Sequence, residues 1–321
     1  IVDAIVEGEQ VRLVTAAAGL PDLTSVADDG GGVEAQTADP LFEDAFMAIL
    51  KGGLTSAPAS MPVDAPQPVA TGVPQDAVIE VHDLQRRCGE FYAVKGVSFA
   101  VKRGEIFGLL GANGAGKTTT FRMLCGLLPV TTGEARVAGC DLRHGAARAR
   151  ARLGYMAQRF SLYSDLTGLQ NLRFFASAYG LGRVRSRERI SWALEAFELG
   201  NYANASSRDL PLGFKQRLAM AAALLHEPHI LFLDEPTSGV DPLARREIWQ
   251  RINALAESGV TVLVTTHFME EANYCDRLVI MADGVVLAAG TPAAMKARFR
   301  SDEKPDPTME DAFIGLIEAR D

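Results

Sequence analysis

The stretch Gly111-Ala-Asn-Gly-Ala-Gly-Lys-Thr118 decides the fold of this 321-residue chain. It fits the pattern G-x-x-x-x-G-K-[ST], in which glycines let backbone N–H groups approach phosphate oxygens without interference from a Cβ atom. We expect the Lys117 ammonium to reach the β- and γ-phosphates of a nucleotide and the Thr118 hydroxyl to coordinate Mg²⁺. Taken alone, a glycine-rich match is also compatible with an ordinary surface loop, so the flanking sequence has to decide.

The residues on either side supply a strand, a loop and a helix in the required order. Ile106-Phe-Gly-Leu-Leu110 is a short apolar run suited to a buried strand, and residues 118–128 carry apolar side chains at helical spacing. Such a helix would point its N-terminus at the bound anion. The residues predicted to bind the nucleotide in this loop are Gly111, Asn113, Gly114, Gly116, Lys117, Thr118 and Thr119.

Two further apolar runs end in polar side chains. Residues 230–233 predict a buried strand that ends in Asp234 and Glu235, and residues 262–266 predict another that is followed by His267. Side chains at the carboxyl ends of such strands reach the ligand crevice of α/β folds. We predict that Asp234 holds Mg²⁺, that Glu235 polarises the attacking water, and that His267 contacts the γ-phosphate. The last role depends on the place of His267 in the series, and Gln158 has no role that can be inferred from its own surroundings.

Taken in order, these segments resemble the ATP-binding subunits of ABC transporters over residues 77–321. Pro236-Thr-Ser-Gly-Val-Asp241 is similar to the family's D-loop, which includes Asp241, and residues 158–163, 171–175 and 210–216 are similar to YbhF-like drug-efflux ATPases of type 2 ABC exporters. The resemblance implies an ATPase that dimerises, closes on two ATP molecules and drives an export permease for drugs or related compounds. It also implies catalytic roles for Glu235 and His267 and a metal-coordinating role for Gln158.

The chain departs from the family's pattern at the signature, which usually reads Leu-Ser-Gly-Gly-Gln and here reads Leu210-Pro211-Leu212-Gly213-Phe214. The serine hydroxyl is therefore missing, while Gly213 and the helix dipole could still face a phosphate. The resemblance implies that the signature acts in trans, on ATP held by the partner domain. The departure would therefore weaken the partner's site and leave the site at Lys117 intact.

A second departure lies at Cys88, where the family usually stacks an aromatic side chain on adenine. We expect Phe91 or Tyr92 to take over this contact. If neither does, selectivity for ATP over GTP should be loose.

The expected fold is α/β: a P-loop NTPase, ABC-type nucleotide-binding domain at 77–321 with an antiparallel β flank and a helical subdomain. Alternating polar and apolar residues in 78–82 and 97–101 predict half-buried strands for the flank. The helical subdomain is placed at about 159–225 and a C-terminal tail at 284–321. The content of 48% hydrophobic residues is enough for a sizeable core.

Residues 1–50 are interpreted as the C-terminal stub of a preceding nucleotide-binding domain, and residues 51–76, rich in Pro, Ala and Gly, as a linker. Pro40-Leu-Phe-Glu-Asp-Ala-Phe46 recurs as Pro307-Thr-Met-Glu-Asp-Ala-Phe313, with five of seven positions identical. Coincidence between two helix starts is the alternative explanation. The expected partner is the first nucleotide-binding domain of the same tandem chain or a second copy, and without it the chain should hydrolyse ATP slowly.

The sequence contains no stretch of 18 apolar residues, so we expect no transmembrane segment. A net charge of −8 argues against a nucleic-acid partner. We predict a peripheral protein on the cytoplasmic face of the inner membrane, held by integral-membrane permease subunits. The predicted contact lies near Gln158, Phe160, Leu162 and Tyr163, although the last three could instead be core residues.

Two other functions remain open at this point. One is an ABC ATPase that is not tied to transport, and the other is a regulatory nucleotide-binding domain that does not hydrolyse ATP, which Pro211 favours. The four cysteines have no metal-like spacing, so no zinc or redox role is predicted. The transported substrate cannot be inferred, because the permease selects it.

Overall fold

The computed structural model describes residues 3–7, 10–15, 35–38, 44, 77–302 and 304–320. The predicted linker at 51–76 lies outside the described residues. So does the first copy of the repeat at 40–46, apart from Asp44. The domain boundaries given above stay predictions.

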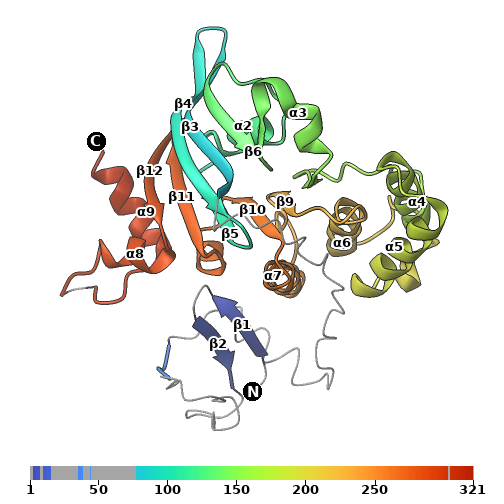
Figure 1. Cartoon of the computed structure of the whole chain (residues 1–321). Helices are drawn as coiled ribbons and strands as arrows, with labels where there is room; N and C mark the ends of the chain where they lie inside the picture. Colours follow the sequence, from blue (N-terminus) through green and yellow to red (C-terminus); the bar gives the residue numbers. More distant parts are fainter. Residues whose placement is uncertain are drawn as a thin grey trace.

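A six-stranded sheet forms the centre of the described structure, with the strand order β12-β11-β5-β10-β9-β8 (Figure 1). Its strands are parallel except for β12, which pairs antiparallel with β11. The strands β5, β9 and β10 are buried at every position, which explains their nearly continuous apolar sequences. The bounds are β5 Ile106–Leu110, β8 Leu153–Met156, β9 Ile230–Asp234, β10 Thr261–Thr266, β11 Arg277–Ala282 and β12 Val285–Gly290.

A second, antiparallel sheet has the order β4-β3-β6-β7 and confirms the predicted flank. Its long hairpin is formed by β3 (Ala77–Cys88) and β4 (Phe91–Lys102), and the shorter strands are β6 (Thr132–Val137) and β7 (Cys140–Asp141). The strands β3 and β4 extend well beyond the alternating segments that predicted them, because exposed polar residues continue the hairpin ladder to its tip.

The helix α2 (Lys117–Leu124) lies between the two sheets. Phe121 of this helix is fully buried, and its ring meets Phe232 of β9 edge-on at a centroid distance of 5.2 Å. This packing fixes the start of α2, and with it the phosphate loop, against the central sheet. The helix α3 (Leu142–Arg150) follows β7 and packs against β6 and β7 of the antiparallel sheet.

A group of helices stands beside the sheets, at the right of Figure 1, within the range predicted for a helical subdomain. It consists of α4 (Gly168–Ala178), α5 (Arg183–Ala196), the 3₁₀ turn η1 (Gly200–Tyr202) and α6 (Leu212–Ala223). Thr167 and Gln170 form a capping box that starts α4.

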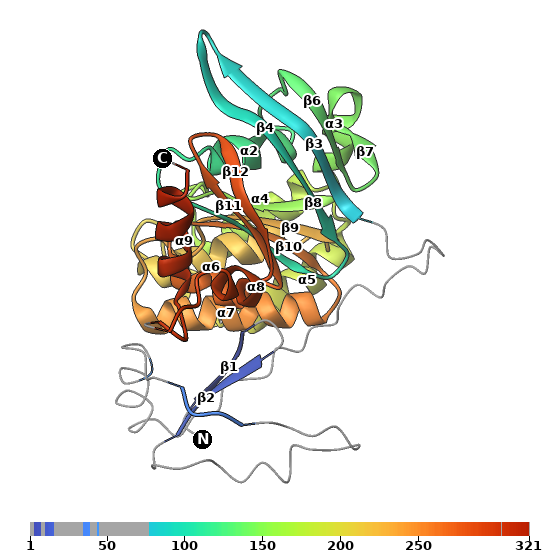
Figure 2. The ribbon, with the colours of Figure 1, turned by 90° about the vertical axis from the view of Figure 1, so that its left-hand side faces the viewer.

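The remaining elements lie around the other strands of the central sheet. They are α7 (Pro242–Glu257), η2 (Met269–Tyr274), α8 (Pro292–Ala297) and α9 (Met309–Glu318). An antiparallel pair, β1 (Asp3–Glu7) and β2 (Gln10–Val14), lies next to α7 (Figure 2). Within the described ranges, no helix combines the length and apolar content that crossing a bilayer requires.

Candidate functional site

The phosphate loop joins β5 to α2 and is packed tightly against other backbone segments. Gly116 has φ +97°, and a Cβ atom there would lie 2.7 Å from the carbonyl oxygen of Ala93 in β4. A Cβ atom at Gly111 would lie 2.2 Å from the carbonyl oxygen of Met281 in β11. Only glycine fits these two positions, and the loop can therefore present its backbone N–H groups.

Lys117 is the first residue of α2, and its side chain is only 3% exposed. Its Nζ atom donates to the carbonyl oxygens of Gly111, at 2.7 Å, and Ala112, at 3.1 Å. Burial lowers the pKa of Lys117, while the nearby charges of Glu235 and Asp234 oppose this shift. The N-cap Gly116 offers no side-chain acceptor to the first N–H groups of α2, and groups of this kind bind anions.

Asp234 lies at the carboxyl end of β9, as the sequence predicts, and is buried. Its Oδ1 atom accepts a hydrogen bond of 2.6 Å from the Thr265 hydroxyl in the neighbouring strand β10, and it lies 3.5 Å from the Thr118 hydroxyl. Burial raises the pKa of Asp234, and the charge of Glu235 adds to the rise. A nearby cation stabilises the charged form of a carboxylate that is buried in this way.

The Glu235 carboxylate brings three of the predicted residues together. The amide of Gln158 donates to its Oε2 atom at 2.7 Å, and Nδ1 of His267 lies 3.2 Å from the same oxygen. Glu235 has φ +48°, which is rare for a residue with a side chain, and its N–H donates to the backbone oxygen and the hydroxyl of Thr265. Strained backbone held by hydrogen bonds is typical of catalytic positions.

The donors around Thr118 and Asp234 fit Mg²⁺, because hydroxyl and carboxylate oxygens are the ligands that this ion prefers. In the part of the chain that the structure describes, no three His, Cys, Asp or Glu side chains are grouped so that they could hold a metal ion. A Mg²⁺ ion is commonly held by only one or two protein oxygens, and phosphate and water oxygens complete its coordination shell. The amide of Gln158 contacts Glu235 here, and its predicted metal role stays a prediction.

The altered signature lies at the start of α6. Pro211 is its N-cap and makes no side-chain capping bond, and Leu212 is 42% exposed. A Cβ atom on Gly239 would lie 3.3 Å from the Leu212 side chain, so this leucine rests against the D-loop. Phe214 packs at 4.1 Å on the ring of Tyr202. Leu210 is buried, and Asp241 of the D-loop caps α7 by accepting from Ala244 N at 3.0 Å.

The two candidate adenine-stacking residues lie at the tip of the β3–β4 hairpin. Phe91 is 67% exposed and stands directly opposite Cys88, while Tyr92 stands opposite Arg87. Opposed residues of antiparallel strands share a face, and neighbours along a strand point to opposite faces. Phe91 therefore shares the face of Cys88, whereas Tyr92 lies on the other face beside the Arg87 guanidinium, 5.8 Å away.

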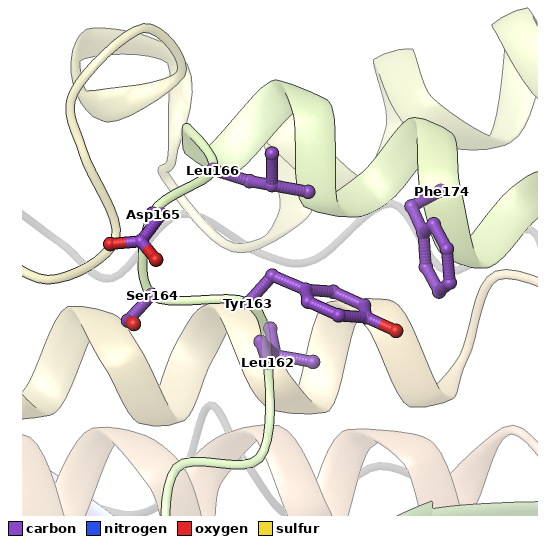
Figure 3. Close-up of a pocket in the computed structure, with 6 residues that line it drawn as sticks. All are labelled: Leu162, Tyr163, Ser164, Asp165, Leu166 and Phe174. Carbon is purple, nitrogen blue, oxygen red and sulfur yellow. The ribbon is translucent and has the colours of Figure 1, made fainter.

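A groove of about 470 Å³ lies where the chain enters α4 (Figure 3). Leu162 of the predicted permease contact is buried in the main apolar cluster, Phe160 is half-buried against it, and Tyr163 is 50% exposed. Tyr163 meets Phe174 of α4 edge-on at 4.6 Å, and Phe174 is exposed as well. The groove is lined by Leu162, Tyr163, Ser164, Asp165, Leu166 and Phe174.

The sequence reasoning missed Thr265, which holds both Asp234 and the N–H of Glu235. A signal was present, because Thr265 and Thr266 are polar residues in a fully buried strand and must find partners inside. It also missed Glu271, whose contacts are described below.

Comparisons with known proteins agree with this geometry. The ABC transporter family profile matches residues 94–238. The chain is 53% identical to the probable multidrug ABC transporter ATP-binding protein YbhF of Escherichia coli (strain K12), over 98% of this chain and 54% of that protein. It is 43% identical to the Nod factor export ATP-binding protein I of Ralstonia nicotianae, over 70% of this chain and 71% of that protein.

A solved dimer of the ATP-binding cassette MJ0796, in a post-hydrolysis state with ADP and Pi, is similar in structure. It has a TM-score of 0.61 at 28% identity and covers 66% of this chain and 98% of that chain. The chain spans about half the length of the first curated relatives that it matches.

Proposed function

This chain belongs to the family of ABC transporter ATP-binding subunits, and from that premise we propose that it binds ATP with Mg²⁺ at Lys117 and hydrolyses it to drive an export permease. The observation that carries the proposal is the meeting of Gln158, Glu235 and His267 at one carboxylate oxygen. This trio stands at the strand ends beside Asp234 and the phosphate loop. Metal-holding, water-polarising and phosphate-contacting groups are thus gathered in one crevice.

Each residue then has a defined task. The ammonium of Lys117 exchanges its two carbonyl partners for phosphate oxygens, and the N-terminus of α2 holds the same anion. Thr118 and Asp234 hold Mg²⁺, which supplies charge neutralisation when bound. Glu235 would orient and deprotonate the attacking water, and His267, which lies beside the Glu235 carboxylate, would contact the γ-phosphate.

The site at Lys117 requires a second nucleotide-binding domain, which supplies a signature in trans. The similarity to the solved cassette dimer supports this arrangement. The partner is the first domain of a tandem protein or a second copy of this chain. The exposed Pro211 and Leu212 would face the partner's nucleotide in return, without the usual hydroxyl. If the partner is the first domain of a tandem protein, ATP at Lys117 would therefore be hydrolysed faster than ATP in the partner.

Phe91 is the residue that would stack on adenine, because it shares the face of Cys88. Base stacking on an aromatic side chain is worth about 1–3 kcal/mol. Replacing Phe91 should therefore weaken ATP binding more than replacing Tyr92 does.

The groove beside Tyr163 and Phe174 would receive an apolar segment from the permease at the cytoplasmic face of the membrane. An exposed aromatic pair beside a hollow suits an amphipathic helix. The names of the relatives, a probable multidrug ABC transporter ATP-binding protein and a Nod factor export ATP-binding protein, support export as the process that is driven.

Equilibrium dialysis of the folded chain with ATP tests the proposal. We expect saturable binding that strengthens with Mg²⁺ and is lost in Lys117→Ala, while Lys95→Ala, at an exposed lysine of β4, binds as wild type. The absence of saturable binding would contradict the proposal. Binding without any hydrolysis, even with the partner domain present, would favour a regulatory domain instead.

A further inference from the structure

Glu271 is a buried carboxylate for which the mechanism so far has no use. It lies in η2, four residues after His267, and is only 1% exposed. Placing a carboxylate in the interior costs free energy unless partners surround it. The partners of Glu271 therefore indicate what it does.

One oxygen of Glu271 contacts the segment that follows the catalytic acid. The Thr237 hydroxyl donates to Oε1 of Glu271 at 2.5 Å, and Thr237 comes two residues after Glu235, at the start of the D-loop. Nε of Arg245, in the first turns of α7, lies 3.7 Å from the same oxygen. Glu271 thus ties the D-loop and the start of α7 to η2.

The backbone of Glu271 also contacts the segment that carries the histidine, because its N–H donates to the carbonyl oxygen of Phe268 at 3.2 Å. Burial raises the pKa of Glu271, while the hydrogen bond from Thr237 opposes this shift. Thr266 directly precedes His267, and its hydroxyl accepts from Phe268 N at 3.0 Å. The segment next to His267 is therefore joined through its backbone to the residue whose carboxylate holds the segment next to Glu235.

Arg245 makes a second connection between the two segments. Its guanidinium carbon lies 4.6 Å from the centre of the Phe268 ring, which in turn lies 4.1 Å from the His267 ring. A cation over an aromatic face is attracted to it. Glu271 and Arg245 together therefore hold the D-loop, α7 and the histidine segment as one unit.

We propose that Glu271 is a positioning residue, which fixes the separation of Glu235 and His267: its carboxylate accepts from Thr237 on one side and holds Arg245 against the Phe268 ring on the other. This inference rests on the proposed function. Glu235 and His267 come from different strands, and their contact at 3.2 Å depends on how those strand ends are held. Small displacements of reacting groups are costly, about 10²-fold for 1 Å.

The test compares Glu271→Ala with Glu270→Ala in the chain assembled with its partner domain. Glu270 is the adjacent, exposed carboxylate on the same element and serves as the matched control. Glu271→Ala should lower kcat about 10-fold or more with KM and nucleotide Kd within about twofold, and Glu270→Ala should match wild type. Glu271→Gln, which keeps an acceptor oxygen for Thr237, should lose less.

A second pair of variants probes the same tie from its other end. Thr237→Val keeps the shape of the side chain but loses the donor, so kcat should fall, and Thr237→Ser should restore it. Combining Thr237→Val with Glu271→Ala should cost no more than Glu271→Ala alone, because both remove one interaction. Additive losses, or a kcat at the wild-type value in Glu271→Ala, would overturn the inference. If Glu271→Ala fails to fold, the Thr237 variants and Glu271→Gln decide.

Amide hydrogen exchange on the nucleotide-free chain gives a result that does not depend on hydrolysis. Glu271→Ala should speed exchange in residues 236–241 and 267–270 together, while residues 111–118 stay as in wild type. A wild-type chain that hydrolyses no ATP, combined with this linked change, would refute the proposed function and support the tie. Unchanged exchange in both segments would refute the tie, whatever the activity.

Discussion

The residues around Lys117 and the signature at the start of α6, which in the proposed arrangement serve two different nucleotide sites, differ in how completely they are equipped. At Lys117 every charged side chain has a partner that prepares it for phosphate and metal, from the two carbonyls on Nζ to the Thr265 hydroxyl on Asp234. At the signature, Pro211 brings no hydroxyl and Leu212 covers Gly239 with an apolar side chain.

If the proposed arrangement holds, the difference means that one domain can hold a complete hydrolysis site and present an incomplete signature to its partner. The fold around both is equally well packed, because α6 is buried over most of its length in the main apolar cluster. The signature therefore lacks particular chemical groups at the start of α6, and the packing of the helix is kept. The predictions below test this contrast.

The largest effect is expected from Glu235→Gln. The amide cannot accept the proton of the attacking water, so turnover should fall by about 10²- to 10⁴-fold. The amide is nearly the same size as the carboxylate, so ATP binding should be retained. Single-turnover hydrolysis and nucleotide binding, measured on the same sample, check this. Wild-type turnover in this variant would mean that the site at Lys117 is not the active one.

A smaller gain is expected when the signature is restored with Pro211→Ser and Leu212→Gly together. The added hydroxyl and the uncovered backbone should raise hydrolysis in the partner's site, by at most about 10²-fold, which is the range for one donor to a developing charge. Pro211→Ala with Leu212→Gly, which lacks the hydroxyl, is the control. The assay is steady-state ATPase of the assembled pair with the partner's own signature unchanged. If the hydrolysis rate rises no more than in the control, the missing hydroxyl does not limit hydrolysis in the partner's site.

Asp234→Asn should stabilise the nucleotide-free protein at neutral pH while weakening Mg²⁺-dependent binding. Because the folded pKa of Asp234 is raised, the folded state binds the proton more tightly than the unfolded state does. Its contribution to stability is therefore largest below pH 3.8 and declines as the pH rises through the folded pKa. Thermal unfolding should show a rise of about 2–4 °C for each kcal/mol gained, and the gain should shrink as the pH falls toward 4. An equal gain at every pH would point to packing instead of charge.

The smallest effect concerns the far end of the signature helix, where His226 stacks on Tyr179 at 3.9 Å and lies 3.1 Å from the Leu153 carbonyl oxygen. Burial lowers the pKa of His226, so the unfolded state binds the proton more tightly. Its stabilising contribution is present above pH 6.5 and is lost as the pH falls below that value. His226→Gln, which cannot take up a proton, should flatten the fall in unfolding free energy between pH 7 and pH 5. Urea unfolding across that range measures this, with His144→Gln, at an exposed histidine, as the control.

Much of the fold could be predicted because the strands that carry the site are buried at every position and contain uninterrupted apolar runs. Residues 106–110, 230–233 and 262–266 each form a strand within one residue of the predicted bounds. The flank was underestimated, since the tip of the β3–β4 hairpin is exposed and lacks polar–apolar alternation, while backbone pairing keeps it extended. The permease contact stays a prediction: Tyr163 is exposed, whereas Leu162 is buried in the core.

The sequence by itself determined the phosphate loop, the acidic pair and the family, because those residues depend on spacing along one chain. Only the tertiary structure decided which distant side chains meet. It placed Thr265 on Asp234, gathered Gln158 and His267 on Glu235, and tied Thr237 to Glu271. Such contacts join residues up to 77 positions apart, and the pairing and packing of strands set them, which no local pattern records.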